Sequence, residues 1–190
     1  MRETALIDLR TRKTLERIRE AFRELAGRED YKKITVSALC AEAKIGRKTF
    51  YVYYESLDAL LEETLEEMVK AYIARINHYT VPENIAEITR EFYLFSLEQG
   101  KFYDNLVLGD HGSAIGARLL MRFVRDTWEK SSWCRALRED DREIILCFIY
   151  NTGAGLYRQW VMSGKKLSLK EMIDRATILL ARGIEGFKLR

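Results

Sequence analysis

Apolar residues recur every three or four positions along most of this chain, which is the spacing that places them on one face of an α-helix. Ile18, Phe22 and Leu25 show this pattern near the N-terminus, with Arg and Glu at positions between them. The pattern predicts about nine helices, over residues 10–26, 36–43, 47–53, 57–78, 82–98, 102–108, 113–130, 140–163 and 168–187. We therefore expect an all-α protein.

Side chains that cap helices mark several of the expected boundaries. Thr35 and Ser56 stand just before two of the predicted helices, and Ser168 and Glu171 have the spacing of a capping box. The clearest interruption surrounds Pro82, which suits the first position of a new helix. The boundaries divide the chain into a first domain over residues 1–55 and a second over 56–190, joined by the fourth helix.

The first domain contains a helix-turn-helix pattern, in which two short helices are separated by a tight turn over residues 44–46. Arg47 and Lys48 begin the second of these helices, where a long cation can reach guanine acceptors or phosphates in the major groove. Hydroxyl groups suited to phosphate contact follow at Thr49, Tyr51 and Tyr53. This spacing favours DNA binding, with a solvated basic helix as the alternative.

Charge is distributed unevenly between the two expected domains. Residues 1–55 contain thirteen Lys and Arg against nine Asp and Glu, a net charge of +4, whereas residues 56–190 contain nineteen against twenty. All the excess positive charge therefore lies at the N-terminal end, where it attracts a polyanion. Many solvated helices carry a similar bias, so the charge supports DNA binding without establishing it.

Residues 34–61 resemble the DNA-binding domain of the TetR-type transcriptional regulators. The most diagnostic part is Thr49-Phe50-Tyr51-x-Tyr53-Tyr54 followed by Leu60-Leu61, and with the first helix the resemblance covers about residues 8–62. It implies a three-helix DNA-binding domain joined by a long helix to a helical domain that senses a ligand and forms a homodimer. The expected partner is double-stranded DNA with a near-palindromic operator sequence.

The same resemblance implies roles for individual side chains. Thr35 and Ser37 would help to hold the DNA backbone, and Tyr53 would contact a phosphate. Phe50 and Tyr54 would pack inward against the first and fourth helices. The side chains implied to face the groove are Arg47, Lys48, Thr49 and Tyr51.

Three positions depart from the usual family pattern. Lys44 stands where the turn usually has a glycine in the left-handed conformation, which costs another residue about 1 kcal/mol. Gly46 replaces the customary serine cap of the second short helix and is a slightly poorer cap. Leu57 replaces a lysine that commonly touches phosphate, so we expect one phosphate contact fewer and a shallower salt dependence.

The second domain shows no arrangement of residues that would catalyse a reaction. His78 and His111 have no second ligand at metal spacing, and Gly164-Lys165-Lys166 lacks the flanking residues of a phosphate loop. Neither GxGxxG nor GxSxG occurs. An enzyme would need a nucleophile or a paired acid and base, so we expect no catalysis, no metal and no cofactor.

The cysteines and the longest apolar run indicate a cytoplasmic protein. Cys40, Cys134 and Cys147 have no metal spacing, and an odd number of cysteines without a recognisable signal peptide indicates a reducing compartment. The longest apolar run, residues 144–150, is too short to cross a bilayer, so no membrane association is expected.

The last two predicted helices are the expected dimer interface. Small residues at Gly153-Ala154-Gly155 would permit close helix approach, and two such helices from each subunit would form a four-helix bundle about a two-fold axis. The alternative is that these faces form an intramolecular core. The residues predicted at the interface are Ile149, Thr152, Gly153, Leu156, Ile173 and Leu180.

Aromatic residues of the second domain are candidates for an effector site. The residues predicted to line a cavity for a small apolar or aromatic molecule are Phe92, Phe95, Phe102, Tyr103, Trp128 and Trp133. Plain core packing is the alternative for each of them, and Trp133-Cys134 is expected in a loop. The leading hypothesis is a homodimeric repressor that a ligand releases from DNA, and the alternative is a helical adaptor without operator binding.

Overall fold

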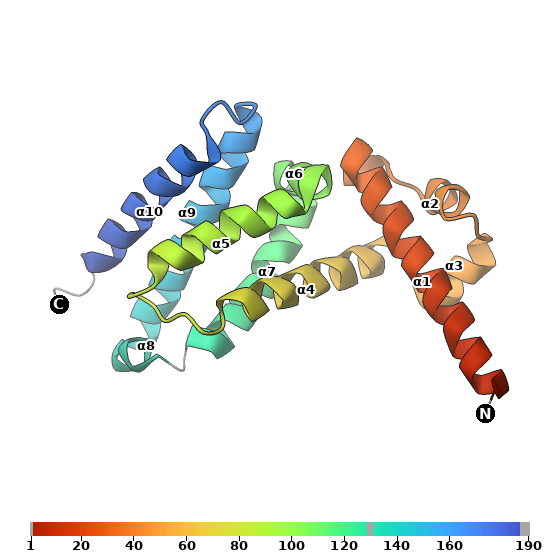
Figure 1. Ribbon diagram of the computed structural model, residues 1–190, viewed down its shortest axis with the longest axis horizontal. Coiled ribbons are helices and arrows are strands. Elements are labelled where there is room, and N and C mark those ends of the chain that lie inside the picture. The colour runs from red at the N-terminus through yellow and green to blue at the C-terminus, as the bar shows by residue number, and fades with distance from the viewer. Residues whose placement is uncertain (1, 129–130, 187–190) are drawn as a thin grey trace.

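The structure is a computed structural model that describes residues 2–128 and 131–186. Within these ranges the chain forms ten α-helices, one short 3-10 helix and no β-strand (Figure 1). The elements are α1 (Arg2–Arg28), η1 (Tyr31–Lys33), α2 (Val36–Glu42), α3 (Arg47–Tyr53), α4 (Leu57–Ile76), α5 (Ile85–Glu98), α6 (Gly100–Leu108), α7 (Asp110–Trp128), α8 (Ser132–Ala136), α9 (Glu139–Met162) and α10 (Leu169–Glu185). The all-α prediction is confirmed.

Helices α1, α2 and α3 form the N-terminal unit and pack around a shared apolar core. Ile18 and Phe22 of α1, Leu39 of α2 and Phe50 of α3 are fully buried there. Leu60 at the start of α4 is also fully buried, so the long fourth helix contributes to this core before it runs into the second unit (Figure 1). The apolar spacing of α1 thus buries one face of that helix.

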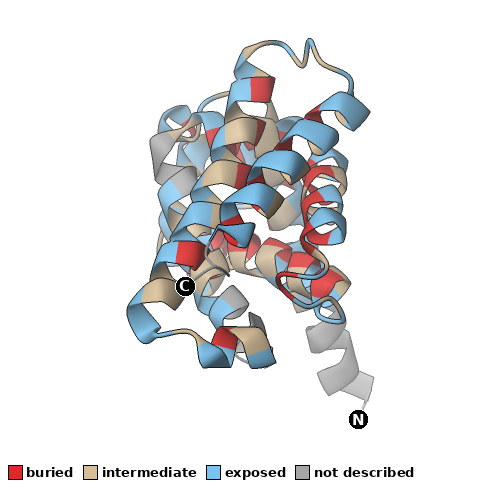
Figure 2. Ribbon diagram, turned by 90° about the vertical axis from the view of Figure 1, so that its left-hand side faces the viewer, coloured by how far each residue is buried: buried red, intermediate tan, exposed pale blue. Residues whose placement is uncertain are grey.

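Helices α4 to α10 form the second unit. Helix α4 lies along α7, and α10 packs on α5 and α9. Figure 2 shows the buried residues on the sides of the helices that face one another, with exposed residues on the outer sides. A second apolar cluster around Tyr93, Tyr157 and Trp160 joins α5 and α9 to the beginning of α10. The main apolar core is continuous from α1 to α10, and this second cluster lies within the second unit alone.

The capping residues agree with the predicted boundaries in all three cases, and Thr35 caps α2. The Ser56 hydroxyl accepts a hydrogen bond from the Ala59 amide at 3.1 Å, and Ser168 and Glu171 form both hydrogen bonds of a capping box. Because such caps depend on residues three positions apart, local sequence is enough to predict them.

Several expected boundaries differ from the structure, since α1 begins at Arg2 rather than near residue 10, α6 at Gly100 and α7 at Asp110. Pro82 is buried in a turn before α5 and does not begin the helix, because Asn84 lies at the cap position and its side chain accepts a hydrogen bond from the Thr80 amide at 3.1 Å. The expected loop at Trp133-Cys134 is instead helix α8, which buries Cys134. This short helix accounts for the tenth helix.

Candidate nucleic-acid interface and effector cavity

The turn between α2 and α3 is held by hydrogen bonds from a side chain of α1 to its backbone carbonyl groups. Lys44 adopts a φ of 53°, in the left-handed region that the sequence predicted for this position. The Arg17 guanidinium donates hydrogen bonds to the carbonyl oxygens of Ala43 at 2.5 Å and of Lys44 at 2.7 Å. At the other end of α2, the Thr35 hydroxyl accepts from the Ala38 amide at 3.1 Å. These contacts set the angle between the two short helices.

Aromatic residues on one side of α3 hold this helix in the core. Phe50 is fully buried, and its ring lies 5.8 Å from that of buried Tyr54, measured between centroids. Gly46 caps the helix without a side-chain hydrogen bond, as its residue type predicts. The side chains of α3 that are exposed to solvent are Arg47, Lys48, Tyr51 and Val52.

A polar network holds this anchored side against α4. The Tyr54 hydroxyl donates to Glu63 Oε1 at 2.7 Å, and the same carboxylate oxygen accepts from Arg19 Nη2 of α1 at 2.7 Å. Burial and the Glu63 carboxylate raise the pKa of Tyr54 to about 12, so the phenol stays protonated at neutral pH. The Glu63 carboxylate of α4 therefore holds both α1, through Arg19, and the end of α3, through Tyr54.

The structure exposes most of the residues predicted to contact DNA. Thr35, Ser37, Arg47, Lys48 and Tyr51 are exposed, whereas Thr49 and Tyr53 are half-buried on the flank of α3. Val52 is exposed beside them and was absent from the predicted set, because the sequence reasoning sought cations and hydroxyl groups. Its position four residues after Lys48, on the same helix face, was the signal that could have identified it.

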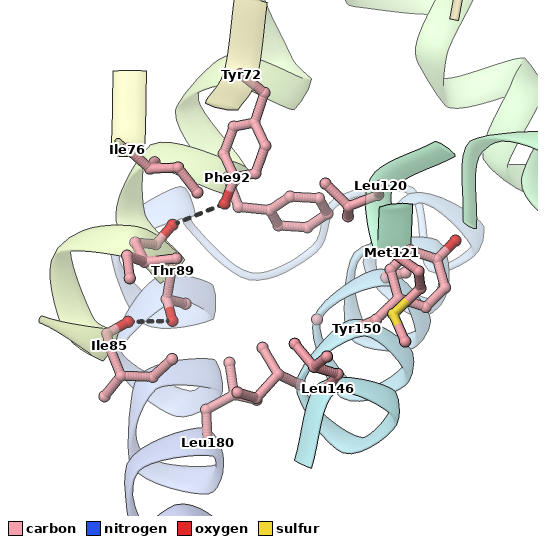
Figure 3. Close-up of a pocket in the computed structure, with 14 residues that line it drawn as sticks. Tyr72, Ile76, Ile85, Thr89, Phe92, Leu120, Met121, Leu146, Tyr150 and Leu180 are labelled. Atoms are coloured by element: carbon pink, nitrogen blue, oxygen red, sulfur yellow. Dashed lines mark hydrogen bonds between the residues drawn. The ribbon is translucent and has the colours of Figure 1, made fainter. Parts of the chain in front are cut away.

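The interior of the second unit contains two neighbouring cavities. The smaller, of about 60 Å³, lies between α4, α5, α7, α9 and α10, and Figure 3 shows its lining. The larger, of about 230 Å³, lies beside it. Five residues line both cavities and form the wall between them: Tyr72, Phe92, Leu120, Tyr150 and Ala154.

The polar groups differ between the two cavities. In the smaller one the Thr89 hydroxyl donates to the Ile85 carbonyl oxygen at 2.6 Å, and the Tyr72 hydroxyl donates to the Ile88 carbonyl oxygen at 3.3 Å (Figure 3). In the larger one, Ser96 is 1% exposed, and its hydroxyl makes no hydrogen bond of ordinary geometry among the described residues, although the Tyr103 hydroxyl of the same lining is close enough to interact with it. A buried hydroxyl without a well-formed hydrogen bond is costly, so Ser96 marks a place where a ligand group can bind.

The predicted cavity residues fall into three groups. Phe92, Phe95 and Tyr103 line the larger cavity. Phe102 does not, because it points toward α1, where its ring lies 6.0 Å from that of Phe22. Trp133 packs against the core from α8 and is absent from the lining of both cavities. The side chain of Trp128 lies outside the described residues.

Three of the six predicted dimer residues face the interior of the protomer. Ile149, Gly153 and Leu180 line the smaller cavity, and a Cβ added at Gly153 would meet no described atom within 4 Å. Packing within the protomer therefore does not require a glycine at this position, and the predicted role of Gly153 between two subunits stays a prediction. Leu156 and Ile173 pack against the second apolar cluster and are half-buried, as is Thr152.

The outer faces of α9 and α10 nevertheless carry exposed apolar side chains. These are Ile144 and Phe148 of α9 and Ile178 and Leu179 of α10. The Phe148 ring lies against Gly183, where an added Cβ would come within 2.4 Å of the ring. A side chain at this position would displace the ring, so the glycine allows α9 and α10 to share one apolar surface.

Helix α6 contacts both units. Its Asn105 side chain donates to the Ala26 carbonyl oxygen at 2.9 Å, near the end of α1, and Phe102 packs on Phe22. On another side, Tyr103 and Leu106 line the larger cavity. The same short helix therefore borders the larger cavity and contacts α1.

Comparison with known proteins agrees with this arrangement of a helix-turn-helix unit and a helical second unit. Residues 18–64 match the profile of bacterial regulatory proteins of the tetR family, and residues 83–182 match that of a transcriptional regulator C-terminal region. No curated protein sequence matches the chain. The fold and the two profile matches define a DNA-binding transcriptional regulator. The chain belongs to the TetR family.

Solved structures with the same fold extend over nearly the whole chain. A TetR transcriptional regulator from Streptococcus agalactiae is 21% identical, with a TM-score of 0.68, and the match covers 93% of this chain and 98% of that one. The regulator FadR from Bacillus subtilis, in complex with stearoyl-CoA, is 18% identical with a TM-score of 0.66, covering 88% and 98%. FadR from Bacillus halodurans, a fatty acid degradation regulator, is 17% identical with a TM-score of 0.65, covering 87% and 97%.

None of the helices within the described ranges combines the length and apolar character that crossing a bilayer requires.

Proposed function

We propose that this chain is a cytoplasmic, homodimeric repressor that binds a specific DNA sequence and is released by a small molecule in its second domain. The observation that carries the proposal is the outer face of α3, where Arg47, Lys48 and Tyr51 are exposed while Phe50 fixes the opposite side in the core. A short helix held in this way presents cations and a hydroxyl group to the major groove.

The remaining predicted residues fit the edges of such a contact. Thr35 and Ser37 at the start of α2 are exposed and would contact the DNA backbone. Half-buried Thr49 and Tyr53 lie on the flank of α3, where their hydroxyl groups would contact phosphates beside the groove.

The dimer would form through the outer faces of α9 and α10. Ile144, Phe148, Ile178 and Leu179 place exposed apolar surface on two adjacent helices. Two copies related by a two-fold axis would bury this surface against itself in a four-helix arrangement. Two α3 helices would then lie in successive major grooves, about 34–36 Å apart, on a near-palindromic operator.

The effector would occupy the larger cavity of about 230 Å³. Engineered cavities of about 150 Å³ bind benzene, so this volume suits a molecule somewhat larger than one aromatic ring. The lining is mainly apolar, and the Ser96 hydroxyl would receive one polar group of the ligand. We therefore propose a small effector with an apolar body and a hydroxyl, carbonyl or similar group at one end.

Release from DNA would pass through α6. A ligand against Tyr103 and Leu106 would favour a different position of this helix, and Asn105 and Phe102 would transmit the change to the end of α1. The ligand weakens DNA binding only by its differential affinity for the two arrangements, typically about 1–3 kcal/mol.

Selection from a random pool of double-stranded DNA tests the proposal. The protein should enrich one near-palindromic sequence and bind it as a dimer. Arg47→Ala and Tyr51→Phe should weaken that binding, whereas Arg138→Ala, a matched loss of an exposed cation in the second domain, should not. Failure to enrich any sequence would favour the helical adaptor, and unchanged affinity of both α3 variants would show that another surface binds DNA.

A further inference from the structure

Val52 is an apolar side chain exposed without a structural reason within the protomer. It is 75% exposed, more than any other large hydrophobic residue in the described part of the chain. A β-branched residue also lowers helix propensity slightly, so helix formation does not explain its presence in a helix of seven residues. Packing within the protomer therefore does not account for this side chain, which is free to contact another molecule.

Helix geometry places Val52 at the centre of the exposed face of α3. Successive residues are about 100° apart around an α-helix, so Lys48 and Val52 each lie about 160° from buried Phe50. The two side chains occupy consecutive turns of the same face. Arg47 and Tyr51 lie on one flank of this face, so the side chains aimed most directly away from the protein core are one lysine and one valine.

The surrounding charge defines the kind of molecule that covers Val52. Arg47 and Lys48 are both exposed in the first turn of the same short helix, and a surface with two cations attracts a polyanion. In the major groove of DNA, the apolar group displayed at base edges is the C5 methyl of thymine. The surface therefore combines cations for phosphates or guanine acceptors with one apolar group for a thymine methyl.

We propose that Val52 is a specificity-determining residue that recognises the methyl group of one thymine in each half of the operator. Lys48 lies one turn earlier on the same face and contacts a neighbouring base or phosphate. The inference rests on the proposed function, in which α3 lies in the major groove, and it adds a base preference that cations and hydroxyl groups alone do not provide.

Replacement of thymine by deoxyuridine tests this contact, because it removes the methyl group and leaves the hydrogen-bonding groups intact. In the selected operator, each thymine is replaced in turn, and the dissociation constant is measured by fluorescence anisotropy. Burial of one methyl group corresponds to about fourfold in affinity, so the wild type should lose about fourfold at one symmetric position for each half-site. The Val52→Ala protein should bind the original operator more weakly and show no further loss at that position.

Two controls make the result specific. Met162→Ala removes another exposed apolar side chain, at the end of α9, and should keep the full sensitivity to deoxyuridine. Val52→Thr keeps one methyl group and should retain part of that sensitivity. An operator without a sensitive thymine, or a Val52→Ala protein with wild-type sensitivity, overturns the inference and leaves the proposed function standing. Enrichment of no sequence by the wild type would overturn the proposed function itself.

Discussion

The outer face of α3 and the cavities of the second unit place exposed and buried residues in opposite ways. In α3 and directly after it, the aromatic residues Phe50 and Tyr54 fill the core, and the groups available to a partner lie outside. In the second unit, Phe92 and Tyr103 border empty space, and the groups available to a ligand lie inside. Both cavities are lined only by residues from Leu65 onward. Complete packing holds the exposed face of α3 rigid. Incomplete packing in the second unit leaves room for a molecule that changes the shape of that unit.

Truncation of Phe50 should cause the largest loss of stability and tests the difference in packing between the two units. Phe50→Ala removes a fully buried ring from a filled core and should lower the free energy of unfolding by about 3–5 kcal/mol. Phe92→Ala is the matched control, because it removes a half-buried ring from the wall between two existing cavities and should cost less. Guanidinium denaturation followed by circular dichroism measures both losses. An equal or larger loss for Phe92→Ala would show that the second unit is packed as tightly as the first.

Removal of one hydroxyl group from each unit should change stability in opposite directions. Thr35→Ala deletes the cap of α2 and should lower the free energy of unfolding by about 1 kcal/mol. Ser96→Ala deletes a buried hydroxyl without a well-formed hydrogen bond and should raise the free energy of unfolding by up to about 1 kcal/mol. Thermal unfolding of the ligand-free proteins gives both signs.

The same Ser96 variant separates stability from ligand binding. Titration with 1-heptanol, an apolar chain with one hydroxyl group, should give tighter binding to the wild type than to Ser96→Ala, because only the wild type pairs the two hydroxyl groups. If both proteins bind the alcohol equally while the variant is less stable, then Ser96 has a structural partner and is not part of an effector site.

Local features of the sequence were enough to predict the first unit. The Thr35 cap, the left-handed residue at Lys44 and the helix from Arg47 to Tyr53 depend on residues a few positions apart, and the structure contains all three. The inward packing of Phe50 and Tyr54 was implied by the resemblance to the TetR family, and both side chains are buried.

Positions in the second unit depend on which helices meet, and periodicity does not specify that. Phe102 and Tyr103 are adjacent in the sequence, but one packs against α1 and the other lines the larger cavity. Gly153 and Leu180 have the spacing of an outer helix face in the sequence, and within the protomer both border the smaller cavity. Each helix of the second unit contacts several neighbours. Helical spacing shows that a face is apolar, but it does not show which neighbouring helix or cavity that face borders.

Two lysines with left-handed backbone should respond differently to glycine. Lys44→Gly relieves the strain at a φ of 53° and should raise the free energy of unfolding by somewhat less than about 1 kcal/mol, since glycine also increases the entropy of the unfolded chain. Lys165 has a φ of 54°, but its Nζ lies 2.6 Å from Asp104 Oδ2. Lys165→Gly loses this ion pair and should gain less or be destabilised. Equal gains at both positions, measured by urea denaturation, would mean that the Lys165 contact contributes nothing.

The smallest expected effect is on the salt dependence of DNA binding, through Leu57 beside the proposed DNA-contacting face. Leu57 is half-buried in the first turn of α4, where the related regulators commonly have a lysine that touches phosphate. Leu57→Lys should add one phosphate contact, which strengthens operator binding a few-fold at low salt and steepens the plot of log K against log salt by about 0.9 for each subunit. Leu57→Met keeps the apolar contact and should leave the slope unchanged. A slope that does not change in Leu57→Lys would mean that the start of α4 lies too far from the DNA, so that α2 and α3 alone carry the backbone contacts.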